Sequence, residues 1–526
     1  MPGALPVGGG PAGLYASTMT DGVDEAADPV DGPGEPAGAN EPAPAPSRPG
    51  APAPLATEPR PVVRRGVPTW YRRALVAAVV VALLVPAVHG ALWVAQAPGS
   101  SAEPVAGGPS TPAPGPGAAT GQLQAGNVPP PTAAAVADLL ARRSAAVLAR
   151  DRAGWLSTLD SRVPGLVAAQ GEVFARIALV RPVSWRYQVL SADDSPPATG
   201  GSLPAGAVLA HVRLAYRLAA SAPEVTRDQH LTLTRRDGWL VAGTDAGTQQ
   251  RDPWDLGPVT VARTARTVVV ASSRSSLPAE RTAREADAAA SRVDRVWGTD
   301  WPRTAVLYLP ADLDEMAALL GRSSATGLDQ LAAVTTGESG GGTGSRTTGD
   351  RVVLNPAGFA QLTATGRDAV LAHELTHVAT RASVRDRPPL WVDEGFADYV
   401  AYLGSPLRTR DLAADVLTSP AEVAGLAELP ADEKFDPAAG RVGPAYAEAW
   451  LAMRFVAQQG GTAQVVDFYR VAVGLEPLRR WPGAPPPSPA LTPRTPLEHA
   501  CLDVTGFVYP SFVRRWVAYV RALAAQ

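Results

Sequence analysis

Residues 373–377 read His-Glu-Leu-Thr-His, and this short segment constrains the fold more than any other part of the chain. On an α-helix, side chains four positions apart project from the same face, one turn apart. His373 and His377 can therefore bind one metal ion together if this segment is helical. Glu374 is expected to face the same cleft, where it can take a proton from an attacking water. The segment thus predicts a helix with two metal ligands and a general base.

A second helix is expected to supply the remaining ligand. Pro388 and Pro389 break the chain after the first helix, and the apolar segment that begins at Leu390 carries Glu394 and Asp398. Glu394 is the better candidate for a third ligand, whereas Asp398 is better placed to accept a hydrogen bond from a ligating histidine. Two histidines and one carboxylate leave a fourth position open, as a catalytic zinc site requires. We therefore expect Zn²⁺ as the cofactor.

Two simpler interpretations of the motif remain open. The histidines could be solvated on an ordinary surface helix, or the metal site could be structural and catalytically silent. Coincidence is a weak explanation, because the chain has only 6 histidines and two of them fall in the motif. His211 and His230 lie in predicted strands without metal-like spacing, so we interpret them as packed or solvated side chains.

The stretch 367–402 resembles the active-site core of the gluzincin metallopeptidases, the group that includes thermolysin and the membrane alanyl aminopeptidases. The Glu-Gly-Phe-Ala phrase at 394–397 is similar to the aminopeptidase-like branch. In that group zinc is bound by two histidines and a glutamate in an E-x-x-x-D context, which match His373, His377, Glu394 and Asp398. The resemblance implies a thermolysin-like α+β zincin domain that hydrolyses peptide bonds, with a peptide or protein as substrate.

The sequence also departs from two related patterns. A metzincin would need glycine at position 380 and histidine at position 383, where this chain has Thr380 and Ser383. The Gly-x-Met-Glu-Asn signature, which binds a free substrate amine in the aminopeptidases, does not occur in the chain. Within the resemblance, an endopeptidase is therefore favoured over an exopeptidase.

The resemblance implies two further roles. Gluzincins use a tyrosine or histidine to stabilise the oxyanion, and the helix predicted from Gly443 to about Gln459 resembles their tyrosine-bearing helix. Tyr446 is therefore the candidate oxyanion donor, although a tyrosine on the flank of a core helix explains the same pattern. The strand expected at 351–356 precedes the motif helix, and family order implies that Val353–Asn355 forms an edge that pairs with the substrate main chain.

An uncharged apolar run from Ala74 to Ala95 predicts a transmembrane helix over residues 74–96. Arginines such as Arg72 and Arg73 precede it, whereas residues 97–130 contain no lysine or arginine. The positive-inside rule then places the N-terminus in the cytoplasm and the rest of the chain outside the cell membrane. A cleaved signal peptide ending near Ala97 is the competing interpretation, but the segment before the apolar run is long for one.

Composition divides the rest of the chain. Residues 1–68, rich in Pro, Ala and Gly, are expected to form a disordered cytoplasmic tail, and 97–130 a Pro/Gly-rich linker. Residues 131–250 show helices followed by alternating strands, an order that resembles the nuclear-transport-factor-2-like (NTF2-like) α+β fold. Residues 255–526 are assigned to the gluzincin-like metallopeptidase domain.

Periodicity predicts individual elements within these two domains. Helices are expected at 133–150, 166–175, 279–297 and 512–524, and strands at 184–191, 207–219, 230–235, 238–242, 259–271 and 303–309. Asp237-Gly238 predicts a hairpin turn, and the glycine-rich segment 337–350 is interpreted as a mobile loop.

The remaining composition excludes little. A formal net charge of −3 gives no reason to expect nucleic acid as a partner. The single cysteine, Cys501, rules out an intrachain disulfide. A different class of function also fits the sequence, namely a catalytically silent zinc-binding scaffold or sensor at the cell surface. The oligomeric state cannot be read from the sequence.

Overall fold

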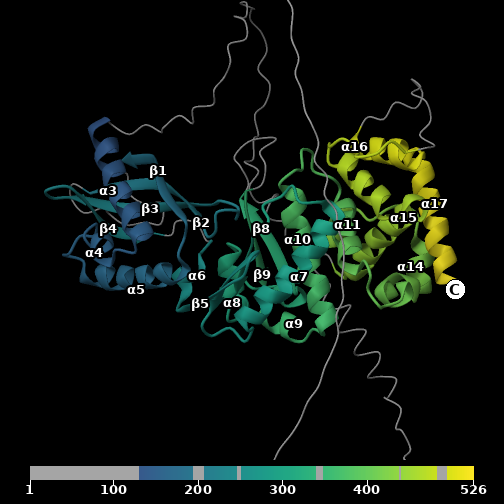
Figure 1. Cartoon of the computed structure of the whole chain (residues 1–526), viewed down its shortest axis with the longest axis horizontal. Helices are drawn as coiled ribbons and strands as arrows, with labels where there is room; N and C mark the ends of the chain where they lie inside the picture. Colours follow the sequence, from purple (N-terminus) through teal and green to yellow (C-terminus); the bar gives the residue numbers. More distant parts are fainter. Residues whose placement is uncertain (1–129, 194–206, 246–249, 339–347, 437–439, 482–494) are drawn as a thin grey trace, which may run out of the picture. The chain divides into compact units, whose positions relative to one another are not determined.

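The computed structural model describes residues 130–193, 207–245, 250–338, 348–436, 440–481 and 495–526, which form a mixed α+β structure with two sheets (Figure 1). The predicted tail, transmembrane helix and, except for Pro130, the linker lie outside these residues. Among the helices that the structure describes, none combines the length and apolarity needed to cross a membrane.

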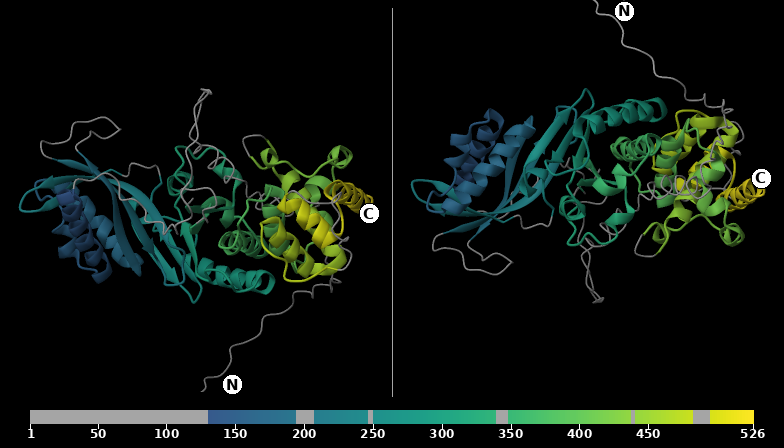
Figure 2. Two further views of the ribbon diagram at one scale, coloured as in Figure 1. Left: turned by 90° about the horizontal axis from the view of Figure 1, so that it is seen from above. Right: turned by 90° about the horizontal axis from the view of Figure 1, so that it is seen from below.

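The first sheet is antiparallel, and its four strands follow one another in chain order. They are β1 (Ser184–Asp193), β2 (Val208–Arg217), β3 (Val225–Arg235) and β4 (Trp239–Asp245). Three helices precede them: α3 (Pro130–Ala149), α4 (Arg152–Leu156) and α5 (Pro164–Val180). Figure 2 shows these helices, in blue, on one face of the sheet. Leu139 of α3 packs there with Val212 and Leu231 in a shared apolar cluster. The predicted order of helices before an antiparallel sheet is confirmed.

The β3–β4 hairpin forms where Asp237-Gly238 predicted it. The Arg236 amide donates to the Gly238 carbonyl at 2.9 Å, and Arg235 pairs with Trp239. Strand β3 begins at Val225 and not at His230 as the sequence predicted. Its first half carries mostly polar side chains, so apolar and polar residues do not alternate there. The backbone of this half nevertheless pairs with β2.

The second sheet has the strand order β5-β6-β7-β9-β8. β6, β7 and β9 are parallel to one another, whereas β5 and β8 are antiparallel strands at the two edges. The strands are β5 (Val259–Arg263), β6 (Thr267–Ser272), β7 (Ala305–Leu309), β8 (Ala333–Glu338) and β9 (Thr348–Leu354), preceded by the short helix α6 (Pro253–Leu256).

Two predictions about this sheet are wrong. Residues 259–271 form two strands and not one, because the chain turns where the Thr264 amide donates to the Thr267 carbonyl at 2.9 Å. This turn contains neither glycine nor proline, the residues that usually indicate a turn in a sequence. The strand that carries Val353 and Leu354 is not an edge, since β9 lies between β7 and β8. The edge is β8. Of the predicted mobile loop at 337–350, residues 337–338 belong to β8 and 348–350 to β9, and residues 339–347 lie outside the described residues.

The two faces of the second sheet contact different parts of the chain. On one face, Leu307 and Val352 share a core with helix α7 (Ala279–Trp297), which has the predicted bounds, and with α10 (Ala364–Arg381). On the other face, Val306 and Val353 belong to a second cluster together with Trp185, Tyr216 and Trp254. The helices before the first sheet and the strands of both sheets therefore contribute to one continuous apolar cluster.

Helices make up most of the structure after β9. They are α9 (Pro356–Ala360), α10, α11 (Leu390–Tyr402), α12 (Thr409–Leu412), α13 (Ala414–Leu417), α14 (Pro420–Gly425), η2 (Asp432–Phe435), α15 (Gly443–Ala472), α16 (Pro496–His499), η5 (Ala500–Val504) and α17 (Tyr509–Ala524); α8 (Leu313–Leu319) and η1 (Leu328–Gln330) lie before β8. The backbone of α15 is non-helical at Gly460 and Gly461, where φ of Gly461 is 65°. This break coincides with the predicted helix end near Gln459.

Candidate metal centre

Helix α10 carries the His-Glu-Leu-Thr-His motif. Thr363 caps its first turn by accepting a hydrogen bond from the Gly366 amide at 3.1 Å. Every residue from Ala369 to Thr380 is buried, so the helix is enclosed on all sides and not only along one stripe. His373 and Glu374 are 0% exposed and His377 is 1% exposed. The interpretation of the motif as a solvated surface helix is therefore wrong.

Helix α11 brings the carboxylates to α10. It begins after Pro389, where Asp432 accepts a hydrogen bond from the Leu390 amide at 2.8 Å. Gly395 allows α11 to lie close to α15, because a Cβ at this position would lie 2.5 Å from the Ala449 carbonyl oxygen. The glycine that follows Glu394 is thus required by helix packing.

The two histidines and Glu394 converge. His373 Nε2 lies 3.2 Å from Glu394 Oε2 and 3.1 Å from His377 Nε2. His377 Nε2 lies 3.5 Å from the same glutamate oxygen. One ligand atom from each of the three residues lies within 4.8 Å of the other two. This buried group could bind a metal ion.

A carboxylate on α11 lies beside the Nδ1 atom of each histidine. His373 Nδ1 lies 2.8 Å from Asp398 Oδ1, the contact expected from the sequence. Asp393 Oδ2 lies 3.6 Å from His377 Nδ1, and Asp393 also accepts a hydrogen bond of 2.7 Å from Tyr469. The contact with Asp398 fixes the ring orientation of His373 and leaves its Nε2 for the metal, whereas Asp393 lies at ion-pair distance from His377. Asp393 was not among the site residues predicted from the sequence, although its position next to Glu394 is a usable signal.

The protonation states of the metal-free cluster follow from these contacts. Burial lowers the pKa of His377, but the charges of Glu394 and Asp393 outweigh it and raise the pKa to about 9. Burial also lowers the pKa of His373, but Asp398 and Glu394 outweigh it, and the pKa lies well above the ordinary value. Burial raises the pKa of Glu394, but the two histidines lower it to about 2. Without a metal, protons shared within the cluster balance the negative charge.

Glu374 occupies a different environment from Glu394. Thr335 on β8 donates a hydrogen bond of 2.5 Å to Glu374 Oε2. Oε1 of Glu374 is buried and has no hydrogen-bond partner among the described residues. A buried carboxylate oxygen is expected to need a partner, and a general base needs one free oxygen. The arrangement therefore fits the role predicted for Glu374.

A partly buried ion pair contacts Thr335, the residue that binds Glu374. Arg381 Nη1 lies 3.5 Å from Asp350 Oδ1 and donates to the Thr335 carbonyl oxygen at 3.2 Å. Burial raises the pKa of Asp350 to about 6 against the opposing charges of Arg381 and Arg351. None of these residues was singled out from the sequence, because their proximity to the motif depends on the β8–β9 pairing.

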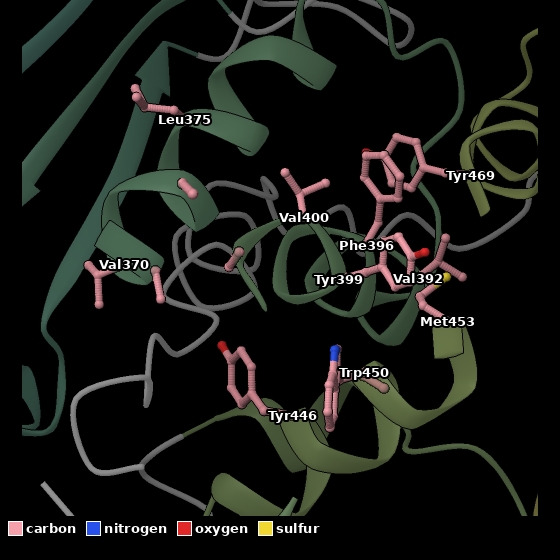
Figure 3. Packing of buried hydrophobic residues seen from close by; sticks show 14 of the residues in the cluster. Val370, Leu375, Val392, Phe396, Tyr399, Val400, Tyr446, Trp450, Met453 and Tyr469 are labelled. Atoms are coloured by element: carbon pink, nitrogen blue, oxygen red, sulfur yellow. The ribbon is translucent and has the colours of Figure 1, made fainter. Parts of the chain in front are cut away.

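Tyr446 lies on α15, where it is 4% exposed and packs edge-to-face against Phe435 at 5.1 Å. Figure 3 shows Tyr446 and Trp450 projecting from α15 toward the residues of α11. Tyr446 is also one helical turn before Ala449, which contacts Gly395. The tyrosine thus lies on the helix next to the ligand-bearing helix, and its role as an oxyanion donor remains a prediction.

The two histidines that the sequence placed in strands, His211 and His230, lie in the first sheet. His211 on β2 is paired with His230 on β3, and their rings stack with centroids 4.7 Å apart. His211 Nε2 also lies 3.4 Å from Asp228 Oδ2. Their surroundings are those of partly exposed strand side chains.

Comparison with known proteins gives no relative for this chain. No protein-family model matches it, and neither a curated protein nor a solved structure does. The proposed function therefore follows from the side chains of the candidate metal centre.

Proposed function

We propose that this protein is a zinc metallopeptidase of the gluzincin type. The observation that carries the proposal is the convergence of His373, His377 and Glu394, with a carboxylate beside Nδ1 of each histidine. Two imidazoles and one carboxylate form a donor set typical of catalytic zinc. Glu374 lies next to His373 on the same helix, and one of its carboxylate oxygens has no partner among the described residues.

In the proposed mechanism, the protein's own residues bind the substrate and move the proton. Zinc, when bound, would lower the pKa of a water and polarise the scissile carbonyl. Glu374 would accept the proton of the attacking water through Oε1 and then deliver it to the leaving amine. Tyr446 would donate a hydrogen bond to the developing oxyanion. Asp393 and Asp398 would hold the histidine rings in place.

The proposed substrate is a peptide or protein in an extended conformation. β8 is the edge strand on the side of the sheet nearest Glu374, and its Thr335 contacts that glutamate directly. An extended peptide can pair with the main chain of such an edge. We therefore propose that β8, and not Val353–Asn355, pairs with the main chain of the substrate.

The proposed function is combined with the cellular location predicted from the sequence. A transmembrane helix at 74–96 would anchor the protein in the cell membrane, with the catalytic domain outside and the tail 1–68 in the cytoplasm. The unit at 131–250 would be an NTF2-like accessory domain.

One observation favours a second candidate function. The metal-binding group and Glu374 are all 2% exposed or less, so a substrate carbonyl cannot reach them without some rearrangement. A surface scaffold or sensor that binds zinc without hydrolysing peptides does not need a substrate carbonyl to reach the metal. The experiment below separates the two functions.

The test is to load the purified protein with zinc, measure the bound metal and assay hydrolysis of a peptide library. One zinc per chain, lost in Glu394→Ala, together with peptide cleavage supports the peptidase. One zinc without cleavage supports the scaffold or sensor. Failure of the wild-type protein to bind zinc would contradict both.

A further inference from the structure

Thr335 contacts the carboxylate that the proposed mechanism uses as a base. Its Oγ1 lies 2.5 Å from Glu374 Oε2 and 3.2 Å from the Glu374 backbone oxygen. A threonine hydroxyl carries one proton, and a carboxylate oxygen is the stronger of these acceptors. The proton therefore lies on the bond to Oε2. Both side chains are 0% exposed, so water does not compete for this bond.

Strand geometry places the hydroxyl there. Side chains alternate between the faces of a strand, and Ala333 on β8 belongs to the core shared with α10, whereas Val334 belongs to the cluster on the other face. Thr335 therefore faces α10. A β-branched residue suits a strand and has few side-chain rotamers, so its hydroxyl is held in one direction.

The strand is held against the catalytic helix at the same residue. Thr335 pairs with Val352 of β9 on one side. Arg381 of α10 donates to the Thr335 carbonyl oxygen at 3.2 Å, and Asp350 on β9 lies 3.5 Å from the same guanidinium nitrogen. Thr335 is thus fixed by the sheet and by an arginine one turn beyond His377.

We propose that Thr335 is a positioning residue that fixes the Glu374 carboxylate by binding Oε2, so that Oε1 faces the attacking water. This inference rests on the proposed peptidase function. It adds a specific role for the edge strand, namely that β8 sets the orientation of the base. The chain offers a matched control in Thr267 on β6, which is also 0% exposed and whose hydroxyl donates to a different carboxylate, Asp287 Oδ1, at 2.7 Å.

The contact itself can be tested without catalysis. In the metal-free full-length protein, Thr335→Val and Glu374→Ala form a double-mutant cycle, read from denaturant unfolding. A hydrogen bond to a charged group is expected to couple the two changes by roughly tenfold in the unfolding equilibrium constant. Thr267→Val paired with Glu374→Ala should show no coupling. Additive effects for the Thr335 pair would overturn the proposal.

The positioning role is tested in the zinc-loaded full-length protein. Thr335→Val should lower kcat by about 10- to 100-fold, because a misplaced base reduces the rate of proton transfer. KM and bound zinc should stay unchanged, since Thr335→Val alters no metal ligand and leaves the main chain of β8, the proposed substrate edge, as it is. Thr335→Ser keeps the hydroxyl and should recover most of the rate, and Thr267→Val should match the wild type.

The two tests separate this inference from the proposed function. Loss of bound zinc in Thr335→Val, or equal loss of kcat in the serine and valine variants, would overturn the positioning role. An unchanged kcat in Thr335→Val would do the same. If the wild-type protein binds zinc but cleaves no peptide, the peptidase proposal fails, while the double-mutant cycle still decides whether Thr335 holds Glu374.

Discussion

Asp393 Oδ2 lies 3.6 Å from Nδ1 of His377, on the side of the imidazole ring opposite the atom available to a metal. The same carboxylate accepts a hydrogen bond from Tyr469 on α15 at 2.7 Å. Together with the Asp398–His373 contact, this gives each histidine its own carboxylate partner from α11. The short helix α11 therefore supplies one ligand and orients the other two.

Replacing Asp393 with alanine is expected to weaken zinc binding by about 10- to 100-fold, because His377 loses the carboxylate that lies beside its Nδ1 atom. Asp398→Ala should weaken binding to a similar degree through His373. The exposed Asp386 serves as the control, and Asp386→Ala should bind zinc like the wild type. Competition with a chelator of known affinity at fixed pH measures the change. Equal affinities for Asp393→Ala and wild type would show that this carboxylate does not support the ligand.

Gly395→Ala should destabilise the fold by about 1–3 kcal/mol, because the added methyl group would overlap the Ala449 carbonyl and push α11 away from α15. Gly425 on α14 is the matched control, since a Cβ there meets nothing within 4 Å. Gly425→Ala should be neutral or slightly stabilising. Denaturant unfolding of the two variants checks the difference, and equal stabilities would contradict the close helix crossing.

The metal-free protein should lose stability as the pH rises from 6.5 to about 9. His377 has an ordinary pKa of 6.5 and a folded-state pKa of about 9, so the folded state holds this proton more tightly. The stabilisation is therefore complete below pH 6.5 and is lost as the pH rises through about 9. The pKa of Glu394, lowered from 4.5 to about 2, adds stability above pH 4.5 that is lost as the pH falls through about 2.

The measurement is the unfolding midpoint in excess chelator across this range. His377→Asn removes the titrating ring and should show a weaker dependence on pH. Zinc affinity should change in the opposite direction and rise with pH, because the metal must displace the histidine protons. A metal-free midpoint that rises between pH 6.5 and 9 would contradict the assigned proton sharing.

Trp254→Ala should lower the stability of both sheets together. Trp254 is 2% exposed and packs against Tyr216 of the first sheet at 5.1 Å, in the cluster that also contains Val306 of the second. Deleting a buried tryptophan typically lowers the free energy of unfolding by about 3–5 kcal/mol. Because the cluster is shared, loss of secondary structure and release of zinc should occur in one transition. Two separate transitions in the wild-type protein would show that the two parts unfold independently.

The sequence predicted those parts of the site that depend on local spacing. The metal-binding group of His373, His377 and Glu394 forms as expected, since helical periodicity and the break at Pro388-Pro389 are local properties. Asp398 also lies where predicted, against His373. In the first sheet, the hairpin at Asp237-Gly238 is a local turn and was found for the same reason.

The parts that the sequence did not predict depend on contacts between distant segments. Thr335 and Glu374 are brought together by a strand whose polar Thr-Thr-Gly segment has no alternating pattern. The edge position of β8 follows from the strand order of the sheet, which single-strand patterns do not encode. Asp350 and Arg381 likewise meet only because β9 packs on α10.

The most direct test of the proposed function is the rate of peptide hydrolysis by zinc-loaded Glu374→Gln relative to the wild type, with bound zinc measured in the same samples. Glutamine has nearly the same shape as glutamate but cannot accept the proton. Residue 374 is not one of the proposed metal ligands, so the change should leave zinc binding intact. The proposal predicts that the variant keeps one zinc per chain and loses at least about 100-fold in kcat. Full activity in Glu374→Gln with zinc bound would contradict the assignment of the base.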